Sequence, residues 1–324
     1  MTDDLDTPEP AVDGGILTIS LAPWFDGSGE DRARVAALVD RSLSDMGFMV
    51  ITDHGIDPEL PGRLRAELLE FFTGPEDVKT AIRVDQLGDR GWVPYGLEAN
   101  GYIFGEDTPP DMKESFVVGM DAIGRASSMS TPWPSAPAGL RDVVVEYTRQ
   151  VEDLHIELMR LCAVALGLDD PEHFVDRESS SDSVMNVNWY PPLVRTGPVQ
   201  ENQFRIGPHT DFGTVTILDR QPGTGCLQVQ DAAGEWHDAE YVPGSLTINV
   251  GDLLEMWSGG RWRSSRHRVL PPSEATPEEG LMSLVFFGEP DDDTMIAPLV
   301  DGDEFEPVRA RDFLEAKIAA ITVA

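Results

Sequence analysis

The chain has 324 residues, 41% of them hydrophobic, a length that fits one large domain or two ordinary ones. It carries 58 acidic and 24 basic residues, which gives a formal net charge of -34. A surface this acidic repels phosphate backbones and anionic lipid, so neither nucleic acid nor a membrane is expected as a partner.

The first half of the chain is predicted to mix helices with short strands. Residues 1–14 are rich in Asp, Pro and Gly and are expected to form a disordered tail. The predicted elements that follow are a strand over 16–21, a helix over 31–46, a strand over 48–51 and a helix over 60–72. Gly47 and the pair Gly74-Pro75 end the two helices, as glycine and proline commonly do.

A long helix is expected between two less regular regions. Residues 85–137 are rich in Gly, Pro and aromatic side chains and predict long loops with short strands. From Ala138 to Gly167, apolar residues alternate at spacings of four and three, which predicts a core helix. His155 lies beside that apolar stripe and is expected to be structural rather than a metal ligand.

After residue 183 the pattern changes to short strands between turn signals. The predicted strands are 184–190, 214–218, 226–230, 245–250, 253–257, 266–270 and 281–287. Many short strands separated by Pro- and Gly-containing turns predict an all-β sandwich or barrel. The early strands need a sheet to join, so one intertwined unit is favoured, with a helical region over 15–180, a β core over 181–300 and a C-terminal helix within 301–324.

The cysteines and the N-terminus indicate a compartment. Cys162 and Cys226 stand far apart without a CxxC motif, which suits a reducing cytoplasm better than a disulfide framework or a zinc module. The chain starts Met-Thr-Asp-Asp-Leu-Asp, acidic where a signal peptide is basic and then apolar. No apolar run approaches the roughly 18 residues of a membrane span. A soluble, cytoplasmic protein is expected, and nothing in the sequence indicates its oligomeric state.

The strongest local signal for chemistry is His209-Thr210-Asp211. In an extended strand, residues two apart project from the same face, so His209 and Asp211 can reach one ion. A second histidine would complete a two-His-one-carboxylate facial triad, which leaves positions on iron(II) open for O2 and organic ligands. His267 lies in a strand-like run and is the predicted third ligand, whereas His237 lies in a predicted turn and is expected to face solvent. The alternative is that these polar residues merely cap turns.

Further segments follow in a familiar order. They are 47–56, 90–94, 113–116, 188–192, 209–218, 226–229, 249–255 and 260–269. Together they make the chain resemble the isopenicillin N synthase-like family of iron(II)/2-oxoglutarate-dependent oxygenases over nearly its whole length. The resemblance implies a mostly β fold with flanking helices (α+β), whose core is a distorted double-stranded β-helix, or jelly roll. It also implies iron(II) held at one end of that core by His209, Asp211 and His267.

The resemblance extends to the co-substrate site, with one departure. The family's Asn-x-Tyr, which helps bind the co-substrate, falls on Asn188 and Tyr190. The family's Arg-x-Ser, which binds a carboxylate, falls on 281–283. There Ser283 is present, but Leu281 stands where the arginine belongs. Leucine cannot supply the charged partner that a buried carboxylate needs.

Three explanations for Leu281 are open. Another arginine supplies the charge, 2-oxoglutarate binds weakly or in another pose, or the enzyme does not use 2-oxoglutarate. Arg205, four residues before His209, and Arg263, four before His267, would both point inward on unbroken strands. Arg266 and Arg268 would point the opposite way. The alternative for Arg205 and Arg263 is a surface salt bridge.

What the resemblance implies for function is an oxygenase that uses O2 and 2-oxoglutarate to hydroxylate, desaturate or cyclise a small molecule of amino-acid, peptide or natural-product type. The aromatic-rich segment 91–116 is expected to line or cover the substrate pocket, or to be ordinary loop packing. One alternative is a 2-oxoglutarate-independent oxidase of the isopenicillin N synthase type. Others are a catalytically silent relative that binds a ligand, and a metal hydrolase, which would favour tetrahedral, His-rich zinc ligation.

Overall fold

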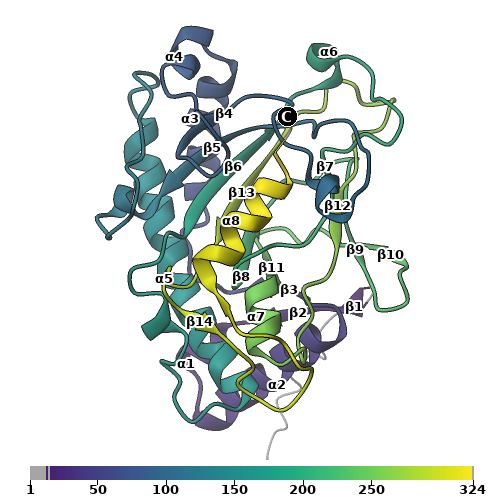
Figure 1. Ribbon diagram of the computed structural model, residues 1–324. Coiled ribbons are helices and arrows are strands. Elements are labelled where there is room, and N and C mark those ends of the chain that lie inside the picture. The colour runs from purple at the N-terminus through teal and green to yellow at the C-terminus, as the bar shows by residue number, and fades with distance from the viewer. Residues whose placement is uncertain (1–11, 14, 323–324) are drawn as a thin grey trace, which may run out of the picture.

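Two facing sheets and flanking helices form most of this computed structural model, which describes residues 12–13 and 15–322 (Figure 1). Within these residues the larger sheet has nine strands in the order β1-β2-β3-β11-β8-β13-β6-β5-β4. The smaller sheet has four in the order β10-β9-β12-β7. A sheet-rich core with flanking helices confirms the predicted fold class.

The bounds of the strands and helices are as follows. The large sheet contains β1 (Val12–Asp13), β2 (Ile16–Ser20), β3 (Phe48–Thr52), β4 (Gly91–Val93), β5 (Glu114–Gly119), β6 (Val184–Tyr190), β8 (Val215–Asp219), β11 (Leu246–Val250) and β13 (Leu281–Phe287). The small sheet contains β7 (Ile206–His209), β9 (Leu227–Gln230), β10 (Trp236–Asp238) and β12 (His267–Val269), and β14 (Met295–Ile296) pairs with β15 (Val308–Arg309). The α-helices are α1 (Ala22–Asp26), α2 (Gly29–Asp45), α3 (Leu60–Thr73), α4 (Glu76–Thr80), α5 (Leu140–Leu166), α6 (Leu193–Thr196), α7 (Asp252–Trp257) and α8 (Ala310–Ala320). Short 3-10 turns occur at η1 (Asn100–Phe104), η2 (Met120–Ile123) and η3 (Val175–Arg177).

The large sheet takes strands from both halves of the chain. β3 pairs with β11 and β5 pairs with β6, both antiparallel, so early strands flank late ones. The division into regions 15–180, 181–300 and 301–324 stays a prediction. Of the predicted tail over 1–14, residues 1–11 and 14 lie outside the described residues, whereas Val12 and Asp13 pair with β2.

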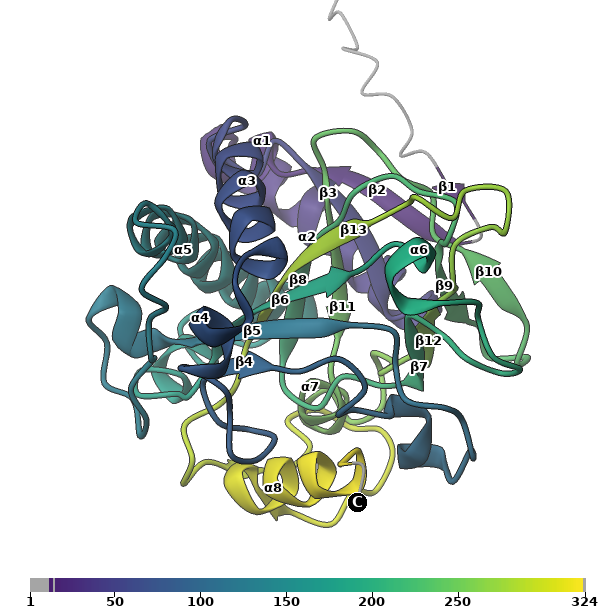
Figure 2. The same ribbon diagram turned by 90° about the horizontal axis from the view of Figure 1, so that it is seen from above.

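Strand β3 shows why the core has two parts. Its residues alternate between faces, as in any strand. Met49 and Ile51 join the large apolar cluster shared with α2, α3 and α5, which pack on one face of the large sheet (Figure 2). Phe48 and Val50 join a smaller cluster with Leu227 and Val229 of β9, between the two sheets. A strand buried on both faces has no polar alternation, which explains the continuous apolar run.

Two local predictions were wrong. Residues 253–257 form helix α7 rather than a strand, because a short apolar run does not distinguish a buried strand from a buried helix. His237 lies in strand β10, where it pairs with Val229, rather than in a turn; its side chain is 35% exposed and Nε2 lies 2.7 Å from Asp231 Oδ2. The tight turn ends at Gly234, and the chain then returns as the second arm of a hairpin.

His155 is buried within α5, and its Nε2 lies 2.7 Å from Glu178 Oε2. The other carboxylate oxygen, Glu178 Oε1, accepts from Thr214 Oγ1 at 2.8 Å. His155 is therefore bound to a structural carboxylate and lies outside the His209–Asp211–His267 cluster described below. Among the described residues, no helix is both long and apolar enough to cross a bilayer.

Candidate metal centre

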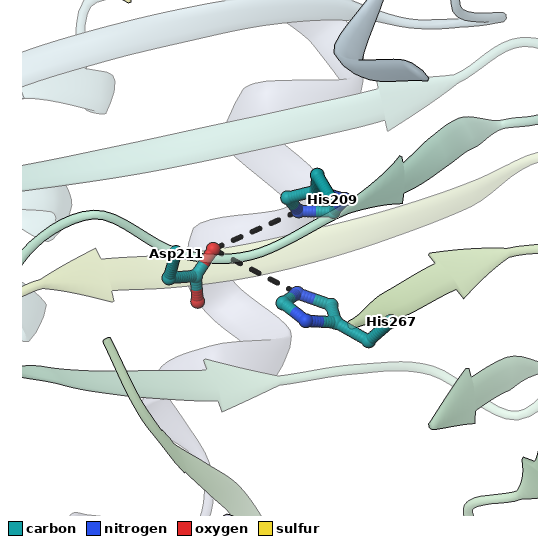
Figure 3. Close-up of side chains that lie close together, drawn as sticks. All are labelled: His209, Asp211 and His267. Carbon is teal, nitrogen blue, oxygen red and sulfur yellow. Dashed lines mark ion pairs between the residues drawn. The ribbon is translucent and has the colours of Figure 1, made fainter. Parts of the chain in front are cut away.

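The structure brings His209, Asp211 and His267 together at one end of the small sheet (Figure 3). His209 is the last residue of β7 and pairs in register with His267, the first residue of β12. Asp211 Oδ1 lies 3.6 Å from His209 Nε2 and 3.7 Å from His267 Nε2. Both distances exceed a good hydrogen bond, and all three side chains are buried. The three donor atoms thus surround one position that an ion can fill.

Asp211 reaches this position in a different way from the one predicted. Strand β7 ends at His209, so Asp211 is not two places along the same strand but in the loop beyond it. The start of α7 holds that loop, since the backbone N–H of Asp252 donates to the Asp211 carbonyl at 2.8 Å. The N–H of Gly251 likewise donates to the Thr214 carbonyl at 2.7 Å. The start of the helix that was predicted as a strand therefore holds the backbone of the loop that carries Asp211.

Both imidazoles are oriented by backbone carbonyls two residues upstream. His209 Nδ1 lies 2.8 Å from the Gly207 carbonyl oxygen, and His267 Nδ1 lies 3.2 Å from that of Ser265. A protonated Nδ1 donates to each carbonyl, and this tautomer leaves the Nε2 lone pair facing Asp211. Phe48 packs its ring against the edge of His267, with centroids 5.3 Å apart. Two oriented imidazole nitrogens and one carboxylate oxygen are the donor set of an iron(II) facial triad, so the residues fit that ion.

The protonation states favour metal binding. Burial, followed by the neighbouring His267, lowers the pKa of His209 to about 3, so its imidazole is neutral at physiological pH. Burial raises the pKa of the Asp211 carboxyl, but His267, His209 and a hydrogen bond from Asn249 outweigh it, and the pKa lies below its usual value. His209 and Asp211 are therefore already in the deprotonated forms that bind a metal ion.

Asn249, on β11, fixes the other oxygen of the carboxylate. Its Nδ2 donates to Asp211 Oδ2 at 2.7 Å, and the side chain is 2% exposed. Oδ1 of Asp211 is thereby left to face the two histidines. The sequence contained Asn249 within the matched segment 249–255, but no local pattern indicated this contact.

We expect Asn249→Ala to weaken iron(II) binding by about 10- to 100-fold, because partners that orient metal ligands contribute on that scale. Anaerobic titration with iron(II) would measure it. Thr247→Ala is the matched control, since Thr247 is an equally buried polar residue two positions earlier on β11. Equal iron affinity in both variants would show that the hydrogen bond does not position Asp211.

The residues expected to contact the co-substrate lie on two paired strands. Asn188 and Tyr190 of β6 lie opposite Ser283 and Leu281 of β13, respectively. Burial raises the pKa of Tyr190 to about 12, although its hydroxyl hydrogen-bonds Ser283 and Arg205 lies nearby. Leu281 therefore faces the tyrosine across the sheet, and no positive charge comes from β13 at that point.

Arg205 brings a guanidinium to this place from another strand. It immediately precedes β7, and its backbone N–H still donates to Val269 of β12 at 3.0 Å. The guanidinium carbon lies 5.5 Å from the Tyr190 ring centroid, and the residue is 1% exposed. Arg205 Nη2 donates to Glu279 Oε1 at 3.0 Å, two residues before Leu281. Arg205 is therefore buried beside the tyrosine and not in a surface salt bridge.

Arg263 does not share this environment. Strand β12 begins at His267, so the strand-parity argument that aimed Arg263 inward does not hold. Its backbone packs against the end of α2, where its N–H donates to the Leu43 carbonyl at 3.2 Å. A Cβ on Gly47 would lie 1.9 Å from the Arg263 carbonyl oxygen, and Gly47 has φ +68°. Both the close approach and the left-handed backbone require glycine there.

Lys113 is a buried cation whose role no sequence pattern indicated. It is 4% exposed, and its Nζ lies 2.6 Å from Glu98 Oε2 and donates to Asn188 Oδ1 at 3.2 Å. Ser115 Oγ donates to the same oxygen of Asn188 at 2.7 Å. Lys113 and Ser115 therefore fix the orientation of the Asn188 amide beside the metal site.

A cavity of about 940 Å³ opens beside the triad and includes His209 and Asp211 in its wall. The predicted pocket segment 91–116 does line it, through Glu98, Asn100 and Lys113 among others, rather than through its aromatic side chains. Helix α8 and the residues after it form another part of the wall. The cavity is large enough for a small organic molecule next to the metal position.

Comparisons with known proteins agree with this geometry. Residues 181–290 match the model of the 2OG-Fe(II) oxygenase superfamily, and residues 16–136 match that of the non-haem dioxygenase in morphine synthesis N-terminal region. The chain is 36% identical over 292 residues to validamycin A dioxygenase of Streptomyces hygroscopicus subsp. limoneus, covering 88% of this chain and 80% of that protein. It is 28% identical over 304 residues to a homoarginine-6-hydroxylase of Glycine max, covering 91% and 84%.

A solved structure shares the fold. The full-length T7H protein of Neurospora crassa, in complex with alpha-KG, superimposes with a TM-score of 0.83 at 24% identity. The match covers 96% of this chain and 99% of that one. The shared fold therefore includes the flanking helices as well as the β core.

Proposed function

The chain belongs to the 2OG-Fe(II) oxygenase superfamily, and from this premise we propose that His209, Asp211 and His267 hold iron(II) for the oxidation of a small molecule. The observation that carries the proposal is the convergence of these three side chains from two strands and a loop. The complete triad argues against a silent ligand-binding relative, because binding alone needs no facial triad. The donor set also differs from the tetrahedral, His-rich sites of zinc hydrolases.

Iron(II), when bound, supplies the activation of O2, with 2-oxoglutarate as the co-substrate that provides electrons. The chain itself provides position and environment. Backbone carbonyls orient the two histidines, and Asn249 holds one oxygen of Asp211 so that the other faces them.

We propose that 2-oxoglutarate binds between the triad and the β6–β13 pair, with Asn188, Tyr190 and Ser283 as contacts. Arg205 then supplies the positive charge in place of the family's arginine, whose position Leu281 occupies. The guanidinium of Arg205 is buried beside the ring of Tyr190, and Tyr190 lies directly opposite Leu281 in the sheet. A buried guanidinium is a suitable partner for a carboxylate, and its planar fork can bind in bidentate fashion. This arrangement supports the first of the three explanations for Leu281.

Anaerobic titration of the iron(II)-loaded protein with 2-oxoglutarate tests the proposal. We expect the weak visible charge-transfer absorption of a chelated 2-oxo acid to appear with sub-millimolar affinity. Protein with iron bound but no absorption change would contradict 2-oxoglutarate use and favour the oxidase of the isopenicillin N synthase type. Succinate release with a substrate would then extend the test to turnover.

For the substrate, we propose an amino-acid or natural-product type of molecule, and hydroxylation rather than desaturation or cyclisation. The support is that the relatives are named for validamycin A and for homoarginine, the latter as a hydroxylase. A cytoplasmic location is also part of the proposal, supported by Cys162 and Cys226 as free thiols. Recovery of the protein outside the cytoplasm of its producing cells would contradict it.

A further inference from the structure

The charges around the cavity are unbalanced. Apart from Asp211, six carboxylates and three cations line it within the described residues. The carboxylates are Asp89, Glu98, Asp182, Glu289, Asp292 and Glu315, and the cations are Arg90, Lys113 and Arg311. A substrate in this cavity therefore contacts a wall with more acidic than basic side chains.

Each of the three cations is already paired with one of these acids. Lys113 lies 2.6 Å from Glu98, as described above. Arg311 Nε lies 2.8 Å from Glu315 Oε1, and its Nη1 lies 3.1 Å from Asp292. Arg90 lies 3.9 Å from Asp182. Arg90 also acts on Glu289 electrostatically, but none of the three cations of the described cavity wall lies within ion-pair distance of the Glu289 carboxyl.

The Glu289 carboxylate has no hydrogen-bond or ion-pair partner among the described residues, and its Oε2 is a buried atom without a donor. Burial, followed by the nearby Glu178, raises the pKa of this carboxyl well above its usual value, because no partner within ion-pair distance offsets the desolvation of its ionised form. Here the side chain lines an open cavity, and a ligand in that cavity can provide the missing partner.

The backbone holds Glu289 close to the metal position. It follows Gly288, whose carbonyl accepts from the N–H of Thr214 at 2.8 Å and whose own N–H donates to Val215 at 3.0 Å. The N–H of Glu289 donates to the buried Ser183 Oγ at 3.0 Å. Asp211 lies only three residues before Thr214, so one hydrogen-bonded unit carries both the metal ligand and the free carboxylate.

We propose that Glu289 binds a positively charged nitrogen of the substrate, so that this oxygenase acts on a cationic amine or guanidine compound. This inference rests on the proposed function. A cation entering the cavity gains an ion pair in a partly dehydrated wall, where a carboxylate substrate would meet repulsion. Glu289 is then a specificity-determining contact, distinct from the metal ligands and from the residues assigned to 2-oxoglutarate.

Matched pairs of cationic and neutral compounds test this inference. n-Butylguanidinium with n-butylurea exchanges a guanidinium for a neutral ureido group of the same shape, and neither compound carries another charged group. Binding to the iron(II)–2-oxoglutarate protein is measured by anaerobic calorimetry, with cyclohexylammonium and cyclohexanol as a simpler pair. We expect the cationic member of at least one pair to bind about 30-fold or more tightly than its neutral partner.

The substitution Glu289→Gln should remove that preference and leave the affinities for iron(II) and 2-oxoglutarate unchanged. Glu315→Gln is the control, because Glu315 lines the same cavity but is paired with Arg311. Equal binding of charged and neutral partners, no cation bound below about 10 mM, or a preference that survives Glu289→Gln would each overturn the inference. If the unmodified, iron(II)-loaded protein shows no absorption change on titration with 2-oxoglutarate, the proposed function itself would be wrong.

Discussion

Replacing Asp211 with alanine should remove iron(II) from the protein and abolish 2-oxoglutarate turnover. The substitution leaves two imidazoles and no anionic oxygen at the centre, so the loss of affinity should exceed the roughly 10- to 100-fold typical of a residue that only orients a ligand. Metal content after anaerobic loading and desalting measures the first effect, and succinate release measures the second.

His237→Ala is the control for the Asp211 variant. It removes a histidine from the partly exposed strand β10, where the ring contacts Asp231 and not the triad. Iron content and turnover should stay at the level of the unmodified protein. An Asp211→Ala protein that retained stoichiometric iron and normal succinate release would show that the metal is held elsewhere.

Replacing Arg205 with leucine should weaken the binding of 2-oxoglutarate by about 2–4 kcal/mol, roughly 30- to 1000-fold in Kd, while iron(II) still binds. The carboxylate of 2-oxoglutarate would lose its only proposed charged partner beside Tyr190. The anaerobic absorption titration measures this change directly. Arg263→Leu is the matched control, because Arg263 lies against α2 and should leave the 2-oxoglutarate affinity unchanged.

A second substitution separates this role from a general effect on folding. Arg205→Leu also removes the charged partner of Glu279, and so can lower stability by itself. In the double variant Arg205→Leu/Leu281→Arg, the arginine returns from β13, opposite Tyr190. We expect partial recovery of 2-oxoglutarate affinity. If the double variant folds and binds iron but recovers nothing, or if Arg205→Leu binds 2-oxoglutarate normally, the assignment of Arg205 is wrong.

The sequence by itself determined the fold class and the triad candidates. The regular spacing of apolar residues predicted α2, α3 and α5, because a long amphipathic helix repeats its pattern over many turns. The HxD triplet and His267 were identifiable because the triplet lies between turn signals and His267 lies in a later strand-like run, and the ordered segments around them indicated the family. These features depend on local pattern or on a motif, and both are present in the linear chain.

Only the tertiary structure determined which charged side chains lie in contact with one another. Arg205 and Leu281 are 76 positions apart in the sequence, and Arg205 reaches Tyr190 only because β7, β6 and β13 come together in the folded core. Lys113 and Glu289 became identifiable through their partners, or the lack of one, across strands and loops. The apolar run of α7 did not by itself distinguish a strand from a helix. Its conformation depends on packing against the loop that carries Asp211, which lies about 40 residues earlier in the chain. Side-chain contacts between distant segments are properties of the packed chain, whereas hydrophobic periodicity is a property of each segment.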